Sequence, residues 1–342
     1  MRLTRLPIEI TTLFYLLMYV PYMMITRALS TTPNEELGRP LSGLETLPAT
    51  LIISTVMLGL FIWLSGWWKS AHHITVGGWR IPFPTKWTAL AGVGTSLLLF
   101  TVPLSLTFEG VSIPFIQLVM RGDVLVIAPL VDLIAGRRVK WYSWVALVVV
   151  CIALGLTLWE RGGLHMPPLA ILAVILYTIG YFMRLSVMTR VAKNDDENAL
   201  KGYFVEEKIV GMPLAILGLA LVAVSPFAAQ GTELSWGFIG VWTSDALPIL
   251  FILSFVFLGI AIFAALILLD PRENTFCVPF ERAASILAGT ISAVLLALMF
   301  GQAMPTKMEL IGMALLIGAI ALLSLAPRWE KRSTLQAAAA PR

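Results

Sequence analysis

Ionisable side chains interrupt several long apolar stretches of this sequence. Five of them are candidates for chemistry: Arg121, Asp123, Arg184, Glu281 and Arg282. If the stretches cross a membrane, an ionisable group within them is unfavourable unless it faces a partner or a water-filled cavity, and such groups mark functional sites. They could bind a charged solute, carry a coupling proton or join two helices as an ion pair.

Arg121 and Asp123 form the clearest cluster. Positions two apart on an α-helix are separated by about 200°, so these side chains point to different sides, and Gln117 shares the face of Arg121. The guanidinium of Arg121 fits bidentate binding of a carboxylate or phosphate, with a structural ion pair as the alternative. Asp123 could bind an amine or carry a coupling proton, or it could be a fixed counter-ion. Which of the two faces a central path stays open.

Glu281 and Arg282 lie about one and a half turns inside an expected helix. They could contact an asymmetric substrate, or they could pair with Lys208 or reach water at the interface. Arg184 and the run Glu206-Glu207-Lys208 near the start of another helix are further candidates. For the run, a solvated helix end is the favoured interpretation. Asp132 favours an interfacial pair with the nearby Arg137 and Arg138.

Tyrosines recur at helical spacing in two places. Tyr15, Tyr19 and Tyr22 form one stripe, and Tyr177 and Tyr181 repeat the spacing of four. Such stripes could line a polar cavity and stack against organic solutes. Packing between helices, or a position at the membrane interface, is the alternative.

Several chemistries lack the residues they need. His72 and His73 have no third ligand nearby, so no metal site or cofactor is expected. Cys151 and Cys277 lie in expected helices and indicate neither a disulfide framework nor a metal site. No phosphate-binding glycine loop or hydrolase motif is present, which argues against ATP-driven pumping and against an enzyme.

The surrounding sequence predicts the elements that position these residues. The chain has 342 residues, of which 13% are charged, and its mean hydropathy is +0.87, which excludes a water-soluble fold. Apolar runs of about 20 residues recur, each long enough to cross a bilayer. The predicted spans are 7–28, 47–68, 87–108, 112–135, 141–159, 168–189, 204–226, 246–269, 276–300 and 306–327.

The distribution of basic residues predicts the topology. With the N-terminus inside, sixteen lysines and arginines lie on the cytoplasmic side, against four on the other. We therefore expect a multi-pass protein of the cell inner (plasma) membrane with both termini cytoplasmic. The first apolar run could also be a secretory signal, but its length and its Pro21 favour a true helix. The slight positive charge is explained by topology without a nucleic-acid partner.

An internal repeat appears at a spacing of 165 residues. Ser112-Ile113-Pro114-Phe115 and Cys277-Val278-Pro279-Phe280 each open a long span that ends at a glycine 22 residues after the proline. These glycines are Gly136 and Gly301. The chain divides into five-helix units 1–165 and 166–328, followed by a cytoplasmic tail 329–342 that we expect to be disordered. Because five is odd, the units have opposite orientations, as in many secondary transporters. Duplication without transport is the alternative.

The five-plus-five arrangement, with a glycine turn and a closing helix in each unit, resembles the drug/metabolite transporter (DMT) superfamily and its EamA-like domains. The residues that carry the resemblance are Ile113-Pro114-Phe115 through Gly136 and Val278-Pro279-Phe280 through Gly301, each with the helix that follows. Arg137 and Gln302 stand where this family often has an acidic residue. The resemblance implies an all-α membrane fold and substrates such as amino acids, other metabolites or cationic drugs, commonly exported.

The sequence therefore predicts a secondary transporter that works by alternating access on a small organic metabolite, charged or zwitterionic. A carrier or flippase for an amphipathic lipid-linked substrate is the alternative within this class. A non-transporting membrane subunit or an intramembrane enzyme is the alternative from another class. The expected partners are the substrate and the lipid bilayer, and assembly into a homo-oligomer is left open.

Overall fold

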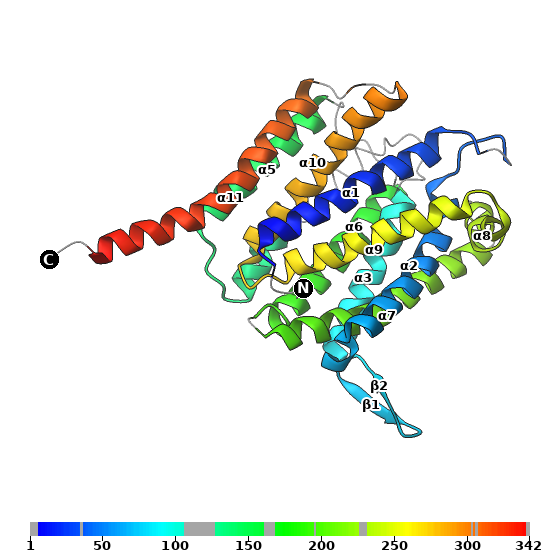
Figure 1. Ribbon diagram of the computed structural model, residues 1–342, viewed down its shortest axis with the longest axis horizontal. Helices are drawn as coiled ribbons and strands as arrows, with labels where there is room; N and C mark the ends of the chain where they lie inside the picture. Colours follow the sequence, from blue (N-terminus) through cyan, green and yellow to red (C-terminus); the bar gives the residue numbers. More distant parts are fainter. Residues whose placement is uncertain are drawn as a thin grey trace.

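The computed structural model describes residues 6–34, 37–105, 127–160, 168–194, 196–225, 231–301, 304 and 307–339 (Figure 1). Three of the predicted site residues, Gln117, Arg121 and Asp123, lie outside these ranges. Their roles therefore stay predictions from the sequence.

Long helices account for most of the described chain. They are α1 (Ile8–Thr31), α2 (Gly43–Ser65), α3 (Lys86–Ser105), α5 (Trp141–Glu160), α6 (Pro168–Val191), α7 (Glu197–Val224), α9 (Leu247–Leu268), α10 (Asn274–Phe300) and α11 (Lys307–Ala339). Residues 127–134 are helical as well. The shorter elements are α8 (Gly231–Ile239) and the 3-10 turns η2 (Trp67–Ser70) and η3 (Gly240–Thr243).

Six helices in the described part of the chain are long and apolar enough to cross a membrane. They are α1, α2, α7, α9, α10 and residues Ile171–Val191 of α6. A helix satisfies its backbone hydrogen bonds internally, which hydrocarbon requires of any spanning segment. The prediction of a membrane-embedded α-helical protein is confirmed at this level.

The helices pack in a recurring pattern (Figure 1). Helix α3 lies against α6 and α7, α1 against α9 and α10, and α2 against α8 and α9, while α5 and α11 pair with each other. Helices α3 and α6 come close together at Gly94 and Gly180. A Cβ atom on Gly94 would lie 2.6 Å from the carbonyl oxygen of Gly180. Small residues at such a crossing let two backbones touch.

A β-hairpin departs from the expected all-α fold. Strands β1 (His73–Val76) and β2 (Trp79–Pro82) pair antiparallel and project from the helix bundle (Figure 1). Gly77 and Gly78 join them with φ of +58° and +86°. Positive φ at both central residues is the requirement of a two-residue type I′ turn, and glycine adopts it without strain.

The C-terminal helix differs from the sequence prediction. Helix α11 continues to Ala339, so residues 329–339 are helical and not the disordered tail that we expected. The cause is local, because alanine, leucine, glutamine, lysine and arginine, which dominate this stretch, are among the strongest helix formers.

Both glycines at which the sequence predicted helix ends have left-handed backbone conformations. Gly136 has a φ of +68°, and Gly301, which caps α10, has a φ of +65°. We expect Gly301→Ala to lower the free energy of unfolding by about 1–2 kcal/mol, because a Cβ atom in this conformation meets the backbone carbonyl. The measurement is a thermal or denaturant unfolding curve of the purified protein.

Gly289, within α10, provides the matched control. Apart from the local backbone, a Cβ atom at Gly289 or at Gly301 would meet no other atom within 4 Å, so the two positions differ in φ, which is positive only at Gly301. Gly289→Ala should therefore be neutral or should stabilise the helix by about 0.5–1 kcal/mol. A gain of stability for Gly301→Ala equal to that of Gly289→Ala would contradict the assigned cap.

Candidate functional site

The first part of the candidate site lies where α1, α6 and α10 meet. Tyr15 of α1 donates a hydrogen bond of 2.5 Å from its hydroxyl to Oε1 of Glu281. Both residues are buried, with exposures of 1% and 4%. The Nε atom of the neighbouring Arg282 lies 3.1 Å from Oε2 of Glu281. The Arg282 guanidinium also lies 5.1 Å from the ring centre of Tyr181 on α6, within reach of a cation–π interaction.

The second part lies between α3, α6 and α7 and is centred on a fully buried carboxylate. Oε1 of Glu207 accepts hydrogen bonds from Thr95 Oγ1 at 2.5 Å, Arg184 Nε at 3.0 Å and Lys208 Nζ at 3.2 Å. Tyr203 donates from its hydroxyl to the backbone carbonyl of Arg184. One negative charge is therefore shared by two cations, the buried Lys208 and the part-buried Arg184.

Helix α6 joins the two parts into one polar cluster. Tyr177, Tyr181 and Arg184 follow one another at spacings of four and three, which places them on one face of the helix. The rings of Tyr177 and Tyr181 are 6.1 Å apart. Tyr181 interacts electrostatically with both Arg282 and Arg184. The cluster thus extends from α1 through α10 and α6 to α7 and α3.

Polar atoms in the cluster have hydrogen-bonding capacity left over. Among the described residues, Tyr181 Oη, Glu207 Oε2 and Glu281 Oε2 are buried without a hydrogen bond. Glu281 and Arg282 form a charge pair without a hydrogen bond between Oε2 and Nε. Buried polar atoms in proteins normally have a hydrogen-bond partner. The three oxygen atoms that have none here are therefore suited to bind a polar ligand.

A row of aromatic rings leads away from the cluster along α1. Ring centres are 5.2 Å apart for Tyr15 and Tyr19, 5.9 Å for Tyr19 and Tyr22, and 5.8 Å for Tyr22 and Phe257 of α9. The stripe predicted from helical spacing is therefore a continuous row of side chains between α1 and α9.

The structure gathers five predicted site residues and adds others. Those it gathers are Tyr177, Tyr181, Arg184, Glu281 and Arg282, with Tyr19 and Tyr22 in the adjoining row. The residues that it adds are Thr95, Tyr15, Tyr203, Glu207 and Lys208. Glu207 and Lys208 were candidates in the sequence, but a solvated helix end was the favoured interpretation. Tyr15 was visible as a member of the first stripe, whereas Thr95 and Tyr203 carried no signal in the sequence.

The interpretation of Glu206-Glu207-Lys208 as a solvated helix end was wrong. These three residues have exposures of 1%, 0% and 7%. Helix α7 begins at Glu197, earlier than the apolar stretch that the sequence shows, so all three lie more than two turns inside the helix. The predicted alternative pairing of Glu281 with Lys208 is not formed either, because Lys208 pairs with Glu207.

Asp132 also has a different role from the predicted interfacial pair with Arg137 and Arg138. Its carboxylate is fully buried and accepts hydrogen bonds from the backbone and side chains of Asn274 and Thr275. It therefore caps the N-terminus of α10, where unpaired N–H groups favour a negative charge. The guanidinium of Arg137 donates instead to backbone carbonyls beyond α6 and between α9 and α10.

The connection between α9 and α10 contains a separate ion pair. Nε and Nη2 of Arg272 donate to the carboxylate of Asp270 at 2.7 Å and 2.8 Å. Burial tends to raise the pKa of Asp270, but the hydrogen bonds and the charge of Arg272 outweigh it and hold that pKa below its ordinary value. The pair stays charged at neutral pH and fixes the approach to the capped end of α10.

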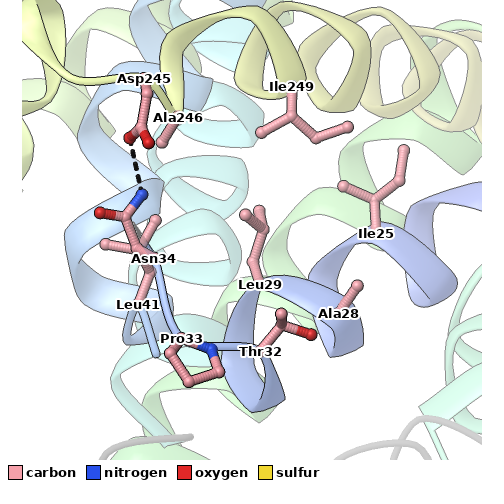
Figure 2. A pocket seen from close by; sticks show the side chains of 10 residues that line it. All are labelled: Ile25, Ala28, Leu29, Thr32, Pro33, Asn34, Leu41, Asp245, Ala246 and Ile249. Carbon is pink, nitrogen blue, oxygen red and sulfur yellow. Dashed lines mark hydrogen bonds between the residues drawn. The ribbon is translucent and has the colours of Figure 1, made fainter. Parts of the chain in front are cut away.

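A surface pocket lies at the other end of α1 and α9 (Figure 2). Its wall is mostly apolar, with Ile25, Ala28 and Leu29 from α1 facing Ile249 from α9. At its rim the amide of Asn34 donates a hydrogen bond of 2.8 Å to Asp245. The pocket contains no residue of the polar cluster, so it is a separate feature of the molecule.

Comparisons with known proteins bear on the fold. No family model and no curated protein matches the chain. In contrast, 27 chains of solved structures match it. One of them, described as the crystal structure of a protein, has a TM-score of 0.57 at 16% identity and covers 92% of this chain and 98% of its own. The likeness shows a shared fold. At this identity it carries no information about activity.

Proposed function

We propose that the protein is a secondary transporter of a small organic solute and that its substrate site is the polar cluster between the helices. One observation carries the proposal: a buried set of charged and aromatic side chains is assembled from both halves of the chain. Helices α1 and α3 come from the first half, and α6, α7 and α10 come from the second. Secondary transporters bind their substrates between two repeats near the membrane midplane.

The packing pattern supports an inverted repeat of five plus five helices. Under the repeat found in the sequence, α1 corresponds to α6, α2 to α7 and α3 to α9. The contact between α1 and α9 then corresponds to the contact between α6 and α3. In the same way, the contact between α2 and α9 corresponds to the contact between α7 and α3. The two closing helices, α5 and α11, pair with each other. A pseudo-twofold relation between the halves predicts each of these pairings, as in the DMT superfamily that the sequence resembles.

The chemistry of the cluster favours a charged or zwitterionic organic substrate. Arg184, Lys208 and Arg282 provide three positive charges, against the two carboxylates of Glu207 and Glu281. A guanidinium can hold a carboxylate or phosphate bidentately, and a carboxylate can hold an amine. The adjoining tyrosine rings offer faces for the organic part of the solute.

The proposed topology has a direct test. We expect both termini to lie in the cytoplasm and the two halves to be oppositely oriented in the inner membrane. Reporter fusions at the C-terminus and in the connection at residues 161–167 should report opposite sides, with the C-terminal fusion active in the cytoplasm. The same side for both fusions would exclude an inverted pair of five-helix units.

The proposed transport activity is tested by profiling metabolites inside and outside cells that lack or overproduce the protein. We expect one charged or zwitterionic metabolite, or a small related group, to shift between the two pools in opposite directions in the two strains. A shift confined to lipid-linked compounds would support a flippase instead. Unchanged pools in both strains, with the protein present in the membrane, would contradict transport.

A further inference from the structure

The exposed β-hairpin has one face made entirely of apolar side chains. In an antiparallel pair, directly opposed residues point to the same face, and residues two apart along a strand do so as well. The register pairs Ile74 with Ile81 and Val76 with Trp79, so these four share a face. Their exposures are 39%, 46%, 54% and 79%, respectively. Thr75 and Arg80 form a pair on the opposite face.

The position of the hairpin in the chain places it at a membrane surface. Helix α2, one of the apolar helices long enough to span a bilayer, ends at Ser65, and the hairpin follows after η2. The base of the hairpin is fixed to α7 through Glu206. Its Oε1 accepts a hydrogen bond from the backbone N–H of His72, and its Oε2 accepts one from the backbone N–H of Thr85. The hairpin is thus held beside the bundle where α2 leaves the bilayer (Figure 1).

The charge of the same segment selects the kind of surface that it meets. Residues 66–88 contain Lys69, Arg80 and Lys86 and no aspartate or glutamate. The three cations are exposed. Lys69 and Lys86 each lie within 6 Å of a tryptophan ring, at 5.8 Å and 5.9 Å from the ring centres. Tryptophan next to basic residues is typical of the headgroup region of a bilayer, and basic clusters attract anionic lipids.

We propose that the hairpin is a lipid-binding element whose apolar face, Ile74, Val76, Trp79 and Ile81, lies in the headgroup–acyl boundary of the bilayer, with Lys69, Arg80 and Lys86 on anionic headgroups. An isolated two-stranded hairpin is marginally stable in water, so a covering surface also explains why this one forms. The occupant is the lipid surface, because charge and position match lipid and the segment emerges directly from a spanning helix. The proposal does not depend on what the bundle transports.

Fluorescent labels on the two faces of the hairpin test this proposal. Single cysteines are introduced as Ile81→Cys on the apolar face and Thr75→Cys on the polar face, in a Cys151→Ala background. Cys277 is fully buried and can stay. The full chain is placed in nanodiscs with or without anionic phosphatidylglycerol and labelled with an environment-sensitive dye. The Cys151→Ala protein without an introduced cysteine, treated with the same dye, is the control for reaction at Cys277.

Opposite responses at the two positions are expected. Nitroxide carried on lipid acyl chains should quench the label at Ile81→Cys at least about twofold more than that at Thr75→Cys, since alternate residues face opposite sides. Aqueous iodide should show the reverse order. Replacing Lys69, Arg80 and Lys86 together by glutamine should abolish the extra quenching that phosphatidylglycerol brings.

Three results would overturn the proposal, the first two for the apolar face and the third for the cations. Equal iodide quenching at both positions would mean that the apolar face stays in water. Shielding of the Ile81→Cys label from iodide and from lipid nitroxide alike would mean that protein, such as a second copy of this chain, covers the face. Identical lipid quenching with and without phosphatidylglycerol would mean that Lys69, Arg80 and Lys86 do not bind anionic headgroups.

Discussion

Glu207→Gln should lower the free energy of unfolding by about 3–5 kcal/mol, because the variant leaves buried cations without their counter-ion. The carboxylate of Glu207 is fully buried and is bonded to Arg184 and Lys208, whose side chains are 13% and 7% exposed. The amide keeps the size of the side chain and removes its charge. Unfolding curves in detergent or nanodiscs, with folded protein measured by size-exclusion chromatography, give the difference.

Glu197 on the same helix provides the matched control. Glu197 pairs with Lys201 one turn away, and both side chains are partly exposed, at 23% and 22%. Glu197→Gln should therefore change stability by at most about 0.3–0.5 kcal/mol. Adding Arg184→Gln to Glu207→Gln should recover part of the loss, since it removes one of the stranded charges. Equal stability of Glu207→Gln and Glu197→Gln would contradict the buried cluster.

Arg282→Lys should reduce the transport rate per folded molecule roughly tenfold or more while leaving the amount of folded protein nearly unchanged. The ammonium still neutralises Glu281, so no buried charge is stranded. It lacks the planar face that lies on the Tyr181 ring, and it cannot hold a carboxylate or phosphate bidentately. Transport is measured with the solute that metabolite profiling identifies.

Two further variants separate binding from scaffold effects at Arg282. Arg282→Gln leaves Glu281 without its charge partner, so the yield of folded protein should fall together with transport. Tyr181→Phe keeps the ring under the guanidinium and removes the buried hydroxyl, which should affect transport less than Arg282→Lys does. Full transport by Arg282→Lys would exclude a role of the guanidinium in binding.

Features with local signals could be predicted from the sequence. Apolar runs indicated the spanning helices, glycines indicated the ends of α10 and of the segment before Gly136, and helical spacing indicated the tyrosine stripes. These predictions depend on neighbours within a few residues, where periodicity and conformational preference act directly. The hairpin had a local signal as well, since Gly77-Gly78 between apolar residues is typical of a two-residue turn.

Features that depend on distant residues could not be predicted. Asp132 caps a helix whose first residues lie 142 positions later in the chain. The burial of Glu207 follows from the packing of α7 on α3, where Thr95 lies 112 positions earlier. Neither pairing has a spacing that a single sequence shows, because unrelated helices bring the partners together. Arg121 and Asp123 lie outside the described residues, so their roles stay predictions from the sequence.

The most direct test of the central claim is solute exchange by the purified protein in liposomes. Vesicles are loaded with a small-molecule extract of cells, and the released compounds are identified against protein-free vesicles and against vesicles with Arg282→Lys at equal folded protein. We predict selective release of one charged or zwitterionic organic solute, or a closely related group, by the wild-type chain, and strongly reduced release by the variant. Release indistinguishable from protein-free vesicles for every compound, with the protein folded and inserted, would contradict a transport function.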